Sequence, residues 1–323
     1  MVDPGTILIV QIGKLGDMIL TTPLFREIKR LFPDSVLSVL ASDLNKAIAQ
    51  NDPHIDKVYV YKKNIQNYLH LYFSSLKKQD IWIDTKSNYS RTSALLLKIF
   101  KPKFSLGFNF TKPVFNIDMH DYLSGKHAVD MNLSPVIYFT NKNYALNKKP
   151  EIRIPEETKV KISSSVNQNT YLKNVVINIS AGDESRYLQK EKWVEIIDRI
   201  GNKEKFCIYL TGLDKDRGII DYIISGTKKY NVKYIKTENI METAEVIRLS
   251  NITISPDTSI IHLCSAFNTP VIGIYPDVKW NLEKFYPLSD NKEIIISGNI
   301  NNIDDVTPQQ VVISFERLSK IIF

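Results

Sequence analysis

One stretch near the C-terminus, residues 254–275, constrains the fold more than any other part of the chain. It begins within a run that alternates polar with β-branched residues, Asn251 to Ser255, and that ends at Pro256 because proline cannot donate a hydrogen bond to a ladder. A helical apolar pattern follows and ends at Asn268-Thr-Pro. Val271 to Tyr275 is then typical of a buried strand. This order of strand, helix and strand predicts a βαβ unit in a parallel sheet.

The expected helix begins with three polar residues, Asp257, Thr258 and Ser259. Free N–H groups and the helix dipole make such an end a binding site for anions, phosphate above all. His262 lies four residues after Thr258 and therefore on the same face of the first turn. Open α/β sheets bind ligands at the carboxyl ends of their strands, where this helix starts. The alternative is an ordinary capped helix, with His262 packed against a neighbouring element.

Length and composition indicate a globular protein with two domains. The chain has 323 residues, of which 43% are hydrophobic and 24% charged. No run approaches the ~18 apolar residues that a bilayer span requires, and the N-terminus lacks the pattern of a secretory signal. Cys207 and Cys264 each lie in an apolar pattern, which favours buried free thiols over a disulfide. These features predict a cytoplasmic protein.

The net charge of +7 favours anionic partners, namely phosphosugars, the anionic face of a membrane, or nucleic acid. Lysine and arginine are dispersed along the chain, so the alternative is a surface that is merely solvated.

The N-terminal half opens on a typical Rossmann-like pattern. Thr6 to Ile12 predicts a parallel strand, Gly13-Lys-Leu-Gly-Asp17 a tight turn, and Met18 to Phe32 a helix. The turn matches neither the G-x-G-x-x-G nor the G-x-x-x-x-G-K-[ST] fingerprint. We therefore expect no dinucleotide cofactor and no P-loop.

The rest of the chain alternates between strand and helix patterns, which predicts parallel sheets with right-handed crossovers. Strands are expected at 36–41, 58–61, 81–84, 104–107, 173–180, 206–212 and 232–235, and helices at 64–78, 92–100, 126–133, 192–200, 216–227, 244–250 and 308–323. Residues 141–170 are read as an interdomain connection with a short strand at 151–154. The predicted domains are 1–165 and 166–323, with the last helix a candidate to pack back on the N-terminal domain.

Asp17 is the leading catalytic candidate. It follows a strand and a glycine turn, so it should lie at the carboxyl edge of the sheet, where small residues let a substrate approach the backbone. The alternative is that Asp17 caps the following helix. Asp84 and Lys86 end another strand on the same side, and with Lys14 they are candidates to contact a substrate.

Basic and acidic residues follow two strands of the second half. Arg186 lies in the loop after the strand that ends at Ser180, with Lys190 and Lys192 as alternatives nearby. Asp214 comes two residues after a strand-end glycine. The sequence contains no Asp-x-Asp pair and no metal-ligand spacing of His, Cys and Asp. A helix dipole and basic residues would then have to hold any leaving diphosphate.

Three segments together resemble glycosyltransferase family 9, which includes the heptosyltransferases of the lipopolysaccharide inner core. Asp257-Thr-Ser-Ile-Ile-His-Leu with Pro270-Val-Ile-Gly-Ile-Tyr is similar to the family's C-terminal motif. Gly16-Asp17 followed by Thr21-Thr-Pro resembles its N-terminal motif, and His127-x-x-Asp-x-x-Leu a middle one. The family usually has glycine where Ser259 stands, so this chain adds bulk beside the expected diphosphate.

The resemblance implies the GT-B arrangement, with two Rossmann-like domains facing across a cleft, and an inverting, metal-independent transfer from a nucleotide sugar. ADP-heptose is the family's commonest donor, and the acceptor would be lipopolysaccharide core or a related anionic glycan at the cytoplasmic face of the inner membrane, not nucleic acid. Asp17 would be the general base. Arg186 stands seven residues before Trp193, where the family has a basic residue. The implied donor site comprises Gly16, Ser180, Arg186, Asp214, Asp257, Thr258, Ser259 and His262.

Two other functions fit the same donor site. A sugar-nucleotide epimerase of GT-B shape would act on the donor without an acceptor. A non-catalytic protein would bind the nucleotide sugar only.

Overall fold

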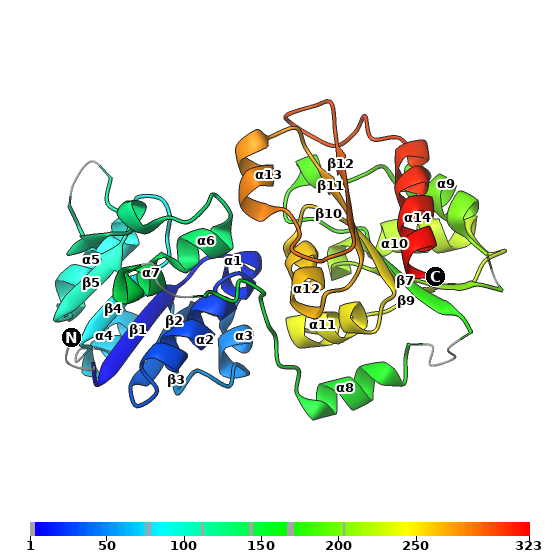
Figure 1. The fold of residues 1–323 in the computed structure, drawn as a ribbon. Coiled ribbons are helices and arrows are strands. Elements are labelled where there is room, and N and C mark those ends of the chain that lie inside the picture. The colour runs from blue at the N-terminus through cyan, green and yellow to red at the C-terminus, as the bar shows by residue number, and fades with distance from the viewer. Residues whose placement is uncertain are drawn as a thin grey trace. The chain divides into compact units, whose positions relative to one another are not determined.

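The computed structural model describes residues 4–74, 76, 79–110, 113–141, 145–166, 171–202 and 204–323. The chain divides into two compact units, Met1–Arg153 and Ile154–Phe323 (Figure 1). The sequence placed this boundary at residue 165. Helix α8 (Glu156–Ser163) lies between the two positions and packs on α11 (Ile240–Arg248) of the second unit.

The first unit is a six-stranded sheet in the order β3-β2-β1-β4-β5-β6, and its described strand pairs are parallel. Its strands are β1 (Thr6–Gln11), β2 (Val36–Ser42), β3 (Lys57–Tyr61), β4 (Ile81–Asp84), β5 (Phe104–Gly107) and β6 (Ile117–Asp118). Its α-helices are α1 (Leu15–Ile19), α2 (Thr22–Leu31), α3 (Lys46–Gln50), α4 (Ile65–Phe73), α5 (Arg91–Phe100), α6 (Ala128–Asn132) and α7 (Ser134–Thr140). This is the Rossmann order, and the point where it reverses lies between β1 and β4.

The second unit repeats the same order when its strands are counted from β7, as β12-β11-β10-β7-β8-β9, again with parallel pairs. Its strands are β7 (Lys173–Asn178), β8 (Phe206–Thr211), β9 (Val232–Tyr234), β10 (Ile252–Pro256), β11 (Val271–Tyr275) and β12 (Lys292–Ile296). Besides α8 and α11 it contains α9 (Lys190–Ile200), α10 (Arg217–Gly226), α12 (Ser259–Phe267), α13 (Lys279–Phe285) and α14 (Pro308–Ile322). Its switch point lies between β7 and β10.

The predicted α/β fold with two Rossmann-like domains is therefore confirmed. Central strands are buried on both faces, as expected for parallel sheets covered by helices, and β10 and β11 are buried at every position. The terminal helix α14 packs on α9 and β12 of its own unit, and its Phe315 joins the core around Trp193. No described helix is long and apolar enough to cross a membrane.

The helix predicted from Met18 to Phe32 is in fact two helices, α1 and α2. Pro23 is the second residue of α2 and has no N–H to continue the helix from α1. The carbonyl of Ile19 instead accepts a hydrogen bond from the Thr22 hydroxyl at 2.8 Å. The break places Asp17 in a five-residue helix of its own.

Residues 151–154 do not form the predicted strand. The Glu151 N–H donates to the Thr22 hydroxyl at 3.0 Å, and its carboxylate lies 3.0 Å from Arg26, so this segment lies along α2. The sequence also missed α8, although Pro155 followed by Glu156 and Glu157 is typical of a helix start. The helix expected at 64–78 ends at Phe73, and residues 75, 77 and 78 lie outside the described residues.

Candidate functional site

The switch point of the first unit brings two polar loops together. Strands β1 and β4 pair in parallel, with Val10 opposite Asp84. The loop carrying Asp17 and the loop carrying Lys86 therefore start from adjacent strand ends. This is the position at which open α/β sheets bind ligands.

Asp17 lies in the first turn of α1 and is half-buried. Its Oδ2 accepts the Lys14 N–H at 3.1 Å, so the carboxylate does cap the helix start. No described residue bonds Oδ1. A Cβ atom at Gly13 would lie 2.8 Å from Asp17 Oδ2, so a larger residue there would require the carboxylate to shift. Capping thus occupies one oxygen and orients the other.

A buried polar network holds α1 against the sheet. The Thr21 hydroxyl donates to the Asp17 carbonyl at 2.7 Å and accepts from the side-chain amides of Gln11 at 3.0 Å and Asn132 at 3.2 Å. Gln11 also donates to Thr85 at 2.7 Å, at the end of β4. The network therefore ties the Asp17 helix to both strands of the switch point. Sequence reasoning assigned no role to Gln11 or Asn132, because neither residue belongs to a charged pattern.

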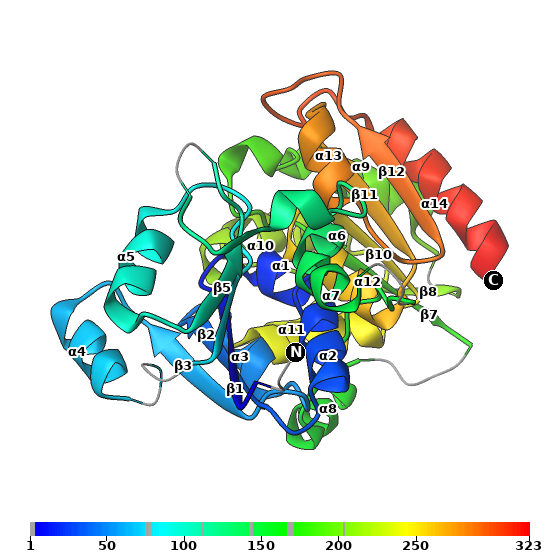
Figure 2. The same cartoon turned by 60° about the vertical axis from the view of Figure 1, so that its left-hand side comes forward.

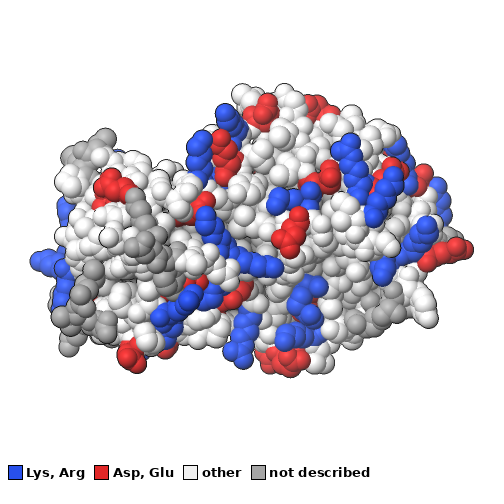
Figure 3. Space-filling view, viewed as in Figure 1, with Lys and Arg blue, Asp and Glu red and all other residues white. Residues whose placement is uncertain are grey.

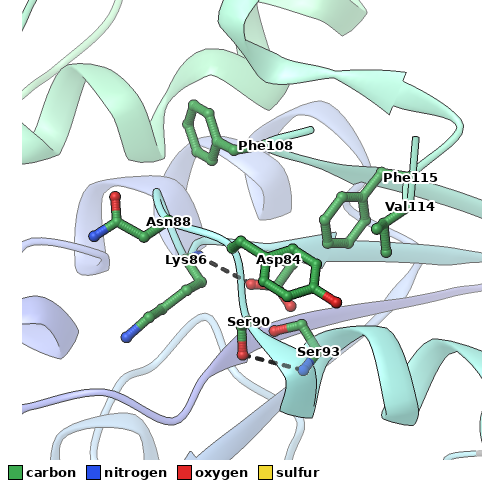
Figure 4. A pocket seen from close by; sticks show the side chains of 9 residues that line it. Asp84, Lys86, Asn88, Ser90, Ser93, Phe108, Val114 and Phe115 are labelled. Carbon is green, nitrogen blue, oxygen red and sulfur yellow. Dashed lines mark hydrogen bonds between the residues drawn. The ribbon is translucent and has the colours of Figure 1, made fainter. Parts of the chain in front are cut away.

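Asp84 lies in a pocket beside this network (Figure 4). Its side chain is buried and its Oδ1 accepts the Lys86 N–H at 2.9 Å. Burial raises the pKa of Asp84 to about 6, although hydrogen bonds from Ser93 and Lys86 favour the charged form. The Lys86 amine is exposed and points away from this carboxyl (Figure 4). The pocket is lined by Asp84, Lys86, Asn88, Tyr89, Ser90, Ser93, Phe108, Val114 and Phe115.

The switch point of the second unit presents a capped helix start. Thr258 is the N-cap of α12, and its hydroxyl accepts the Ile260 N–H at 3.3 Å. Asn178, at the end of β7, donates to Ser255 at 3.0 Å and so joins the two strands of this switch point. Ser259 is the first residue of α12 and is half-buried. Thr258 and Ser259 are therefore both partly exposed at this helix start.

Arg186 is fixed at this helix start by Asp257. Its Nη1 donates to the Asp257 carbonyl at 2.8 Å and lies 3.0 Å from Asp257 Oδ2. Asn281 donates to the same oxygen at 2.7 Å. Asp257 is only 4% exposed, so its carboxylate orients the guanidinium, whose side chain remains 31% exposed. The sequence grouped Asp257 with the donor-binding residues, whereas its contacts are those of a positioning residue.

The other two basic candidates have different partners. The Lys190 amine lies 4.3 Å from the centre of the Tyr222 ring. The Lys192 amine donates to the carbonyls of Asp304 and Val306. Of the three residues, Arg186 is therefore the one held at the start of α12.

Ser180 and Asp214 do not come together. The Ser180 hydroxyl donates to the carboxylate of Asp216 and accepts the Leu213 N–H at 2.8 Å. Asp216 is buried and also accepts from the Tyr187 hydroxyl at 3.1 Å. Asp214 is exposed and lies 3.5 Å from Lys236. The sequence analysis named Asp214 as the acidic residue after this strand. The acidic residue that meets Ser180 is instead Asp216, two residues later.

The remaining candidates are distributed over both units. His262 is 5% exposed and its ring lies 6.0 Å from that of Phe285, so it takes part in packing. Gly16 is the second residue of α1, and the exposed Lys14 precedes that helix. Within the part of the chain that the structure describes, no group of three or more His, Cys, Asp or Glu side chains could hold a metal ion.

Residues 71–312 match the sequence profile of "Glycosyltransferase family 9 (heptosyltransferase)". The chain belongs to glycosyltransferase family 9. It is 22% identical over 274 residues to lipopolysaccharide heptosyltransferase 3 of Escherichia coli, covering 80% of each chain. It is also 22% identical over 288 residues to lipopolysaccharide heptosyltransferase 1 of Campylobacter coli, covering 83% of each.

Solved family 9 structures share the fold. A family 9 glycosyltransferase of Veillonella parvula superimposes with a TM-score of 0.78 at 18% identity, covering 97% of each chain. The ADP-heptose lipopolysaccharide heptosyltransferase II of E. coli gives a TM-score of 0.75 at 16% identity, covering 97% of this chain and 98% of the other. The E. coli heptosyltransferase WaaC, solved with ADP, gives 0.73 at 16% identity, covering 97% of this chain and 99% of the other. The GT-B fold expected from the sequence is thus confirmed.

Proposed function

We propose that this family 9 member is an inverting heptosyltransferase that moves heptose from ADP-heptose to lipopolysaccharide core or a related anionic glycan. The observation that carries the proposal is the Arg186 guanidinium, fixed by Asp257 beside the start of α12. A helix N-terminus with an arginine beside it suits a diphosphate in charge, hydrogen-bond geometry and exposure. The relatives named for heptosyl transfer and the E. coli structure with ADP support the same donor.

In this mechanism the acceptor hydroxyl attacks the anomeric carbon from the side opposite the diphosphate. The new C–O bond forms as the bond to the β-phosphate oxygen breaks, and ADP leaves with both electrons of that bond. The hydroxyl proton passes to Asp17 late in the step, because a carboxylate is a weak base for an alcohol. Single displacement inverts the anomeric centre.

The leaving diphosphate gains negative charge as its bond to the sugar breaks. Arg186 and the N–H groups at Thr258 and Ser259 would stabilise that charge without a metal ion. Lys14, Asp84 and Lys86 would contact the acceptor from the first unit, and the reaction would take place at the cytoplasmic face of the inner membrane. Activity is therefore expected to survive EDTA, and its restoration by Mg²⁺ or Mn²⁺ would contradict this part.

The decisive experiment incubates the purified protein with ADP-heptose and a heptose-acceptor core oligosaccharide. ADP release that depends on the acceptor, with an inverted anomeric configuration by NMR, is expected. Conversion of ADP-heptose in the absence of acceptor would favour the epimerase. Tight binding of ADP-heptose with no turnover on a series of core acceptors would favour the non-catalytic binding protein.

A further inference from the structure

The outward face of α4 is an apolar stripe. Ile65, Leu69 and Phe73 are 78%, 53% and 81% exposed. They stand four residues apart, so they form one line along the helix. Large exposed side chains are common singly, but a continuous line of three is not expected on a face that meets only water.

The inward face of α4 is apolar as well. Leu71 belongs to the core cluster of the first unit, and Tyr68 and Tyr72 pack against that cluster. Surface helices usually carry polar residues on the face away from the core. Gln66 and His70 are exposed beside the stripe. The helix therefore presents apolar side chains to the core and along part of its outward face, which is the pattern of an element covered on both sides.

The net charge of the protein is concentrated in the stretch of sequence that contains this helix. Residues 57–103 contain nine lysines, one arginine and two aspartates, a net charge of +8. The whole chain carries +7, so all other residues together sum to −1. On the face of the molecule drawn in Figure 3, basic and acidic side chains are intermixed over the second unit. The excess of positive charge thus belongs to the segment that contains α4 and α5.

Helix α5 also carries exposed basic residues. Leu71 of α4 and Leu96 of α5 share one core cluster, so both helices cover the same face of the sheet, and both ribbon views show them next to each other (Figure 1 and Figure 2). The exposed residues of α5 include Arg91, Leu95 and Lys98, spaced to lie on one outward face. No ion pair among the described residues engages Arg91 or Lys98.

We propose that this α4–α5 surface, defined by Ile65, Leu69, Phe73, Arg91, Leu95 and Lys98, docks on an anionic phospholipid bilayer. The proposal rests on the proposed function only because a lipid-linked acceptor would lie at the membrane surface. A bilayer interface offers acyl chains to the stripe and anionic headgroups to the flanking cations at the same time. Nucleic acid would match the charge but not the aliphatic stripe. A second copy bound through the same surface would bring like charges together.

The first test measures co-flotation of the full chain with vesicles of phosphatidylcholine alone or mixed with phosphatidylglycerol. Binding to the anionic vesicles only, and weakening with salt, is expected. Ile65→Ser with Phe73→Ser should reduce binding at least about tenfold, because each removes a buried apolar contact from the interface. Arg91→Gln and Lys98→Gln should each reduce it roughly fivefold.

The matched control is Val160→Ser with Ile300→Ser, which changes two similarly exposed residues of the second unit, 67% and 64% exposed, and should leave vesicle binding unchanged.

The second test reports contact directly. Cys207 and Cys264 are buried, so Leu69→Cys introduces the one readily labelled thiol among the described residues, and Val160→Cys is its control. A polarity-sensitive dye at position 69, but not at 160, should shift to the blue with anionic vesicles. No shift at 69, an equal response at both positions, or equal binding to neutral vesicles would overturn the proposal. A dimer of the wild-type protein that is dissociated by Ile65→Ser with Phe73→Ser would also overturn the proposal.

Transfer to a water-soluble core oligosaccharide separates this proposal from the proposed function. The stripe variants should keep that activity while losing vesicle binding. A protein that binds vesicles through this surface but transfers no sugar would contradict the proposed function alone.

Discussion

The two units share one strand order and differ in what they place at the switch point. The first has carboxyl groups there, Asp17 and Asp84, beside a network of neutral amides and hydroxyls that bonds the Asp17 carbonyl. The second has the guanidinium of Arg186 at a helix start, with its partner carboxylate buried behind it. The same topology therefore gives one edge suited to accept a proton and another suited to hold an anion.

The net charges of the two units differ in the opposite sense to their edges. Residues 1–153 contain 21 basic and 13 acidic residues, a net +8, whereas residues 154–323 contain 21 and 22, a net −1. The edge that we propose binds the diphosphate thus lies in the unit without net positive charge. Donor binding must then depend on local geometry, while the charged unit is suited to long-range attraction to an anionic surface. Strand order gives the location of a site, and single side chains give its chemistry.

The largest expected effect is at Asp17. Asp17→Asn keeps an oxygen that can accept the Lys14 N–H, so the cap and the fold should persist. Turnover should fall by ~10²–10⁴ because the base is lost. The measurements are kcat with saturating ADP-heptose and the melting temperature, with the exposed Asp43→Asn as control. Near wild-type turnover would place the base elsewhere, with Asp84 the next residue to test, and early unfolding would make Asp17 structural.

Arg186→Ala tests the other edge. Loss of a charge-assisted hydrogen bond should weaken ADP binding by about 1.5–3 kcal/mol, roughly ten- to a hundredfold. Calorimetry with ADP measures this, and Arg217→Ala, which removes an exposed arginine paired with Asp221, is the matched control. If both variants bind ADP like the wild type, Arg186 is not a donor contact, and the contrast between the two edges fails.

The sequence predicted the positions of both edges because each lies at the end of a strand with a recognisable pattern. Glycine before Asp17 and small polar residues before α12 are local signals that follow from turn and capping chemistry. The partners of Arg186 could not be predicted in this way. Asp257 meets it from 71 residues along the chain, and Asn281 in turn donates to the Asp257 carboxylate. Only tertiary packing decides that this carboxylate faces an arginine and not a phosphate.

The helix break after α1 shows a similar limit. Apolar spacing continues through residues 18–32, and it cannot reveal that the Thr22 hydroxyl takes the bond that Pro23 cannot make. The exposed stripe of α4 was missed for the same reason, since apolar spacing does not tell which of two apolar faces meets the core.

Asp84 should make stability depend on pH in an unusual direction. Burial raises its pKa from 3.8 to about 6, so the unfolded chain loses this proton first as pH rises. Protonated Asp84 therefore stabilises the folded state below about pH 4. This stabilisation, on the order of 2–3 kcal/mol of unfolding free energy, is lost as pH rises to about 6. Asp84→Asn should remove this loss, and urea unfolding at pH 4.5 and 7 measures it.

Asp43→Asn is the matched control for Asp84. The Asp43 carboxyl is exposed, and hydrogen bonding from Lys46 lowers its pKa. The charged form of Asp43 therefore favours folding at higher pH, so Asp43→Asn should not reproduce the effect of Asp84→Asn. If Asp84→Asn changes stability equally at both pH values, its carboxyl is not held protonated by burial.

The smallest expected effect concerns Thr21, which links the Asp17 helix to the sheet. Thr21→Val keeps the shape of the side chain but removes the hydroxyl that bonds the Asp17 carbonyl, Gln11 and Asn132. Each amide keeps another acceptor, Thr85 for Gln11 and the Leu20 carbonyl for Asn132, so the cost should be only about 1–2 kcal/mol of unfolding free energy.

The same substitution should also affect catalysis, because the network orients α1. We expect kcat to fall by about tenfold, while ADP affinity, which we propose depends on the second unit, stays unchanged. Thr21→Ser keeps the hydroxyl and should retain most of the activity. Equal losses in the valine and serine variants would show that the methyl group matters by packing, and an ADP affinity that falls with kcat would show that the two edges do not act separately.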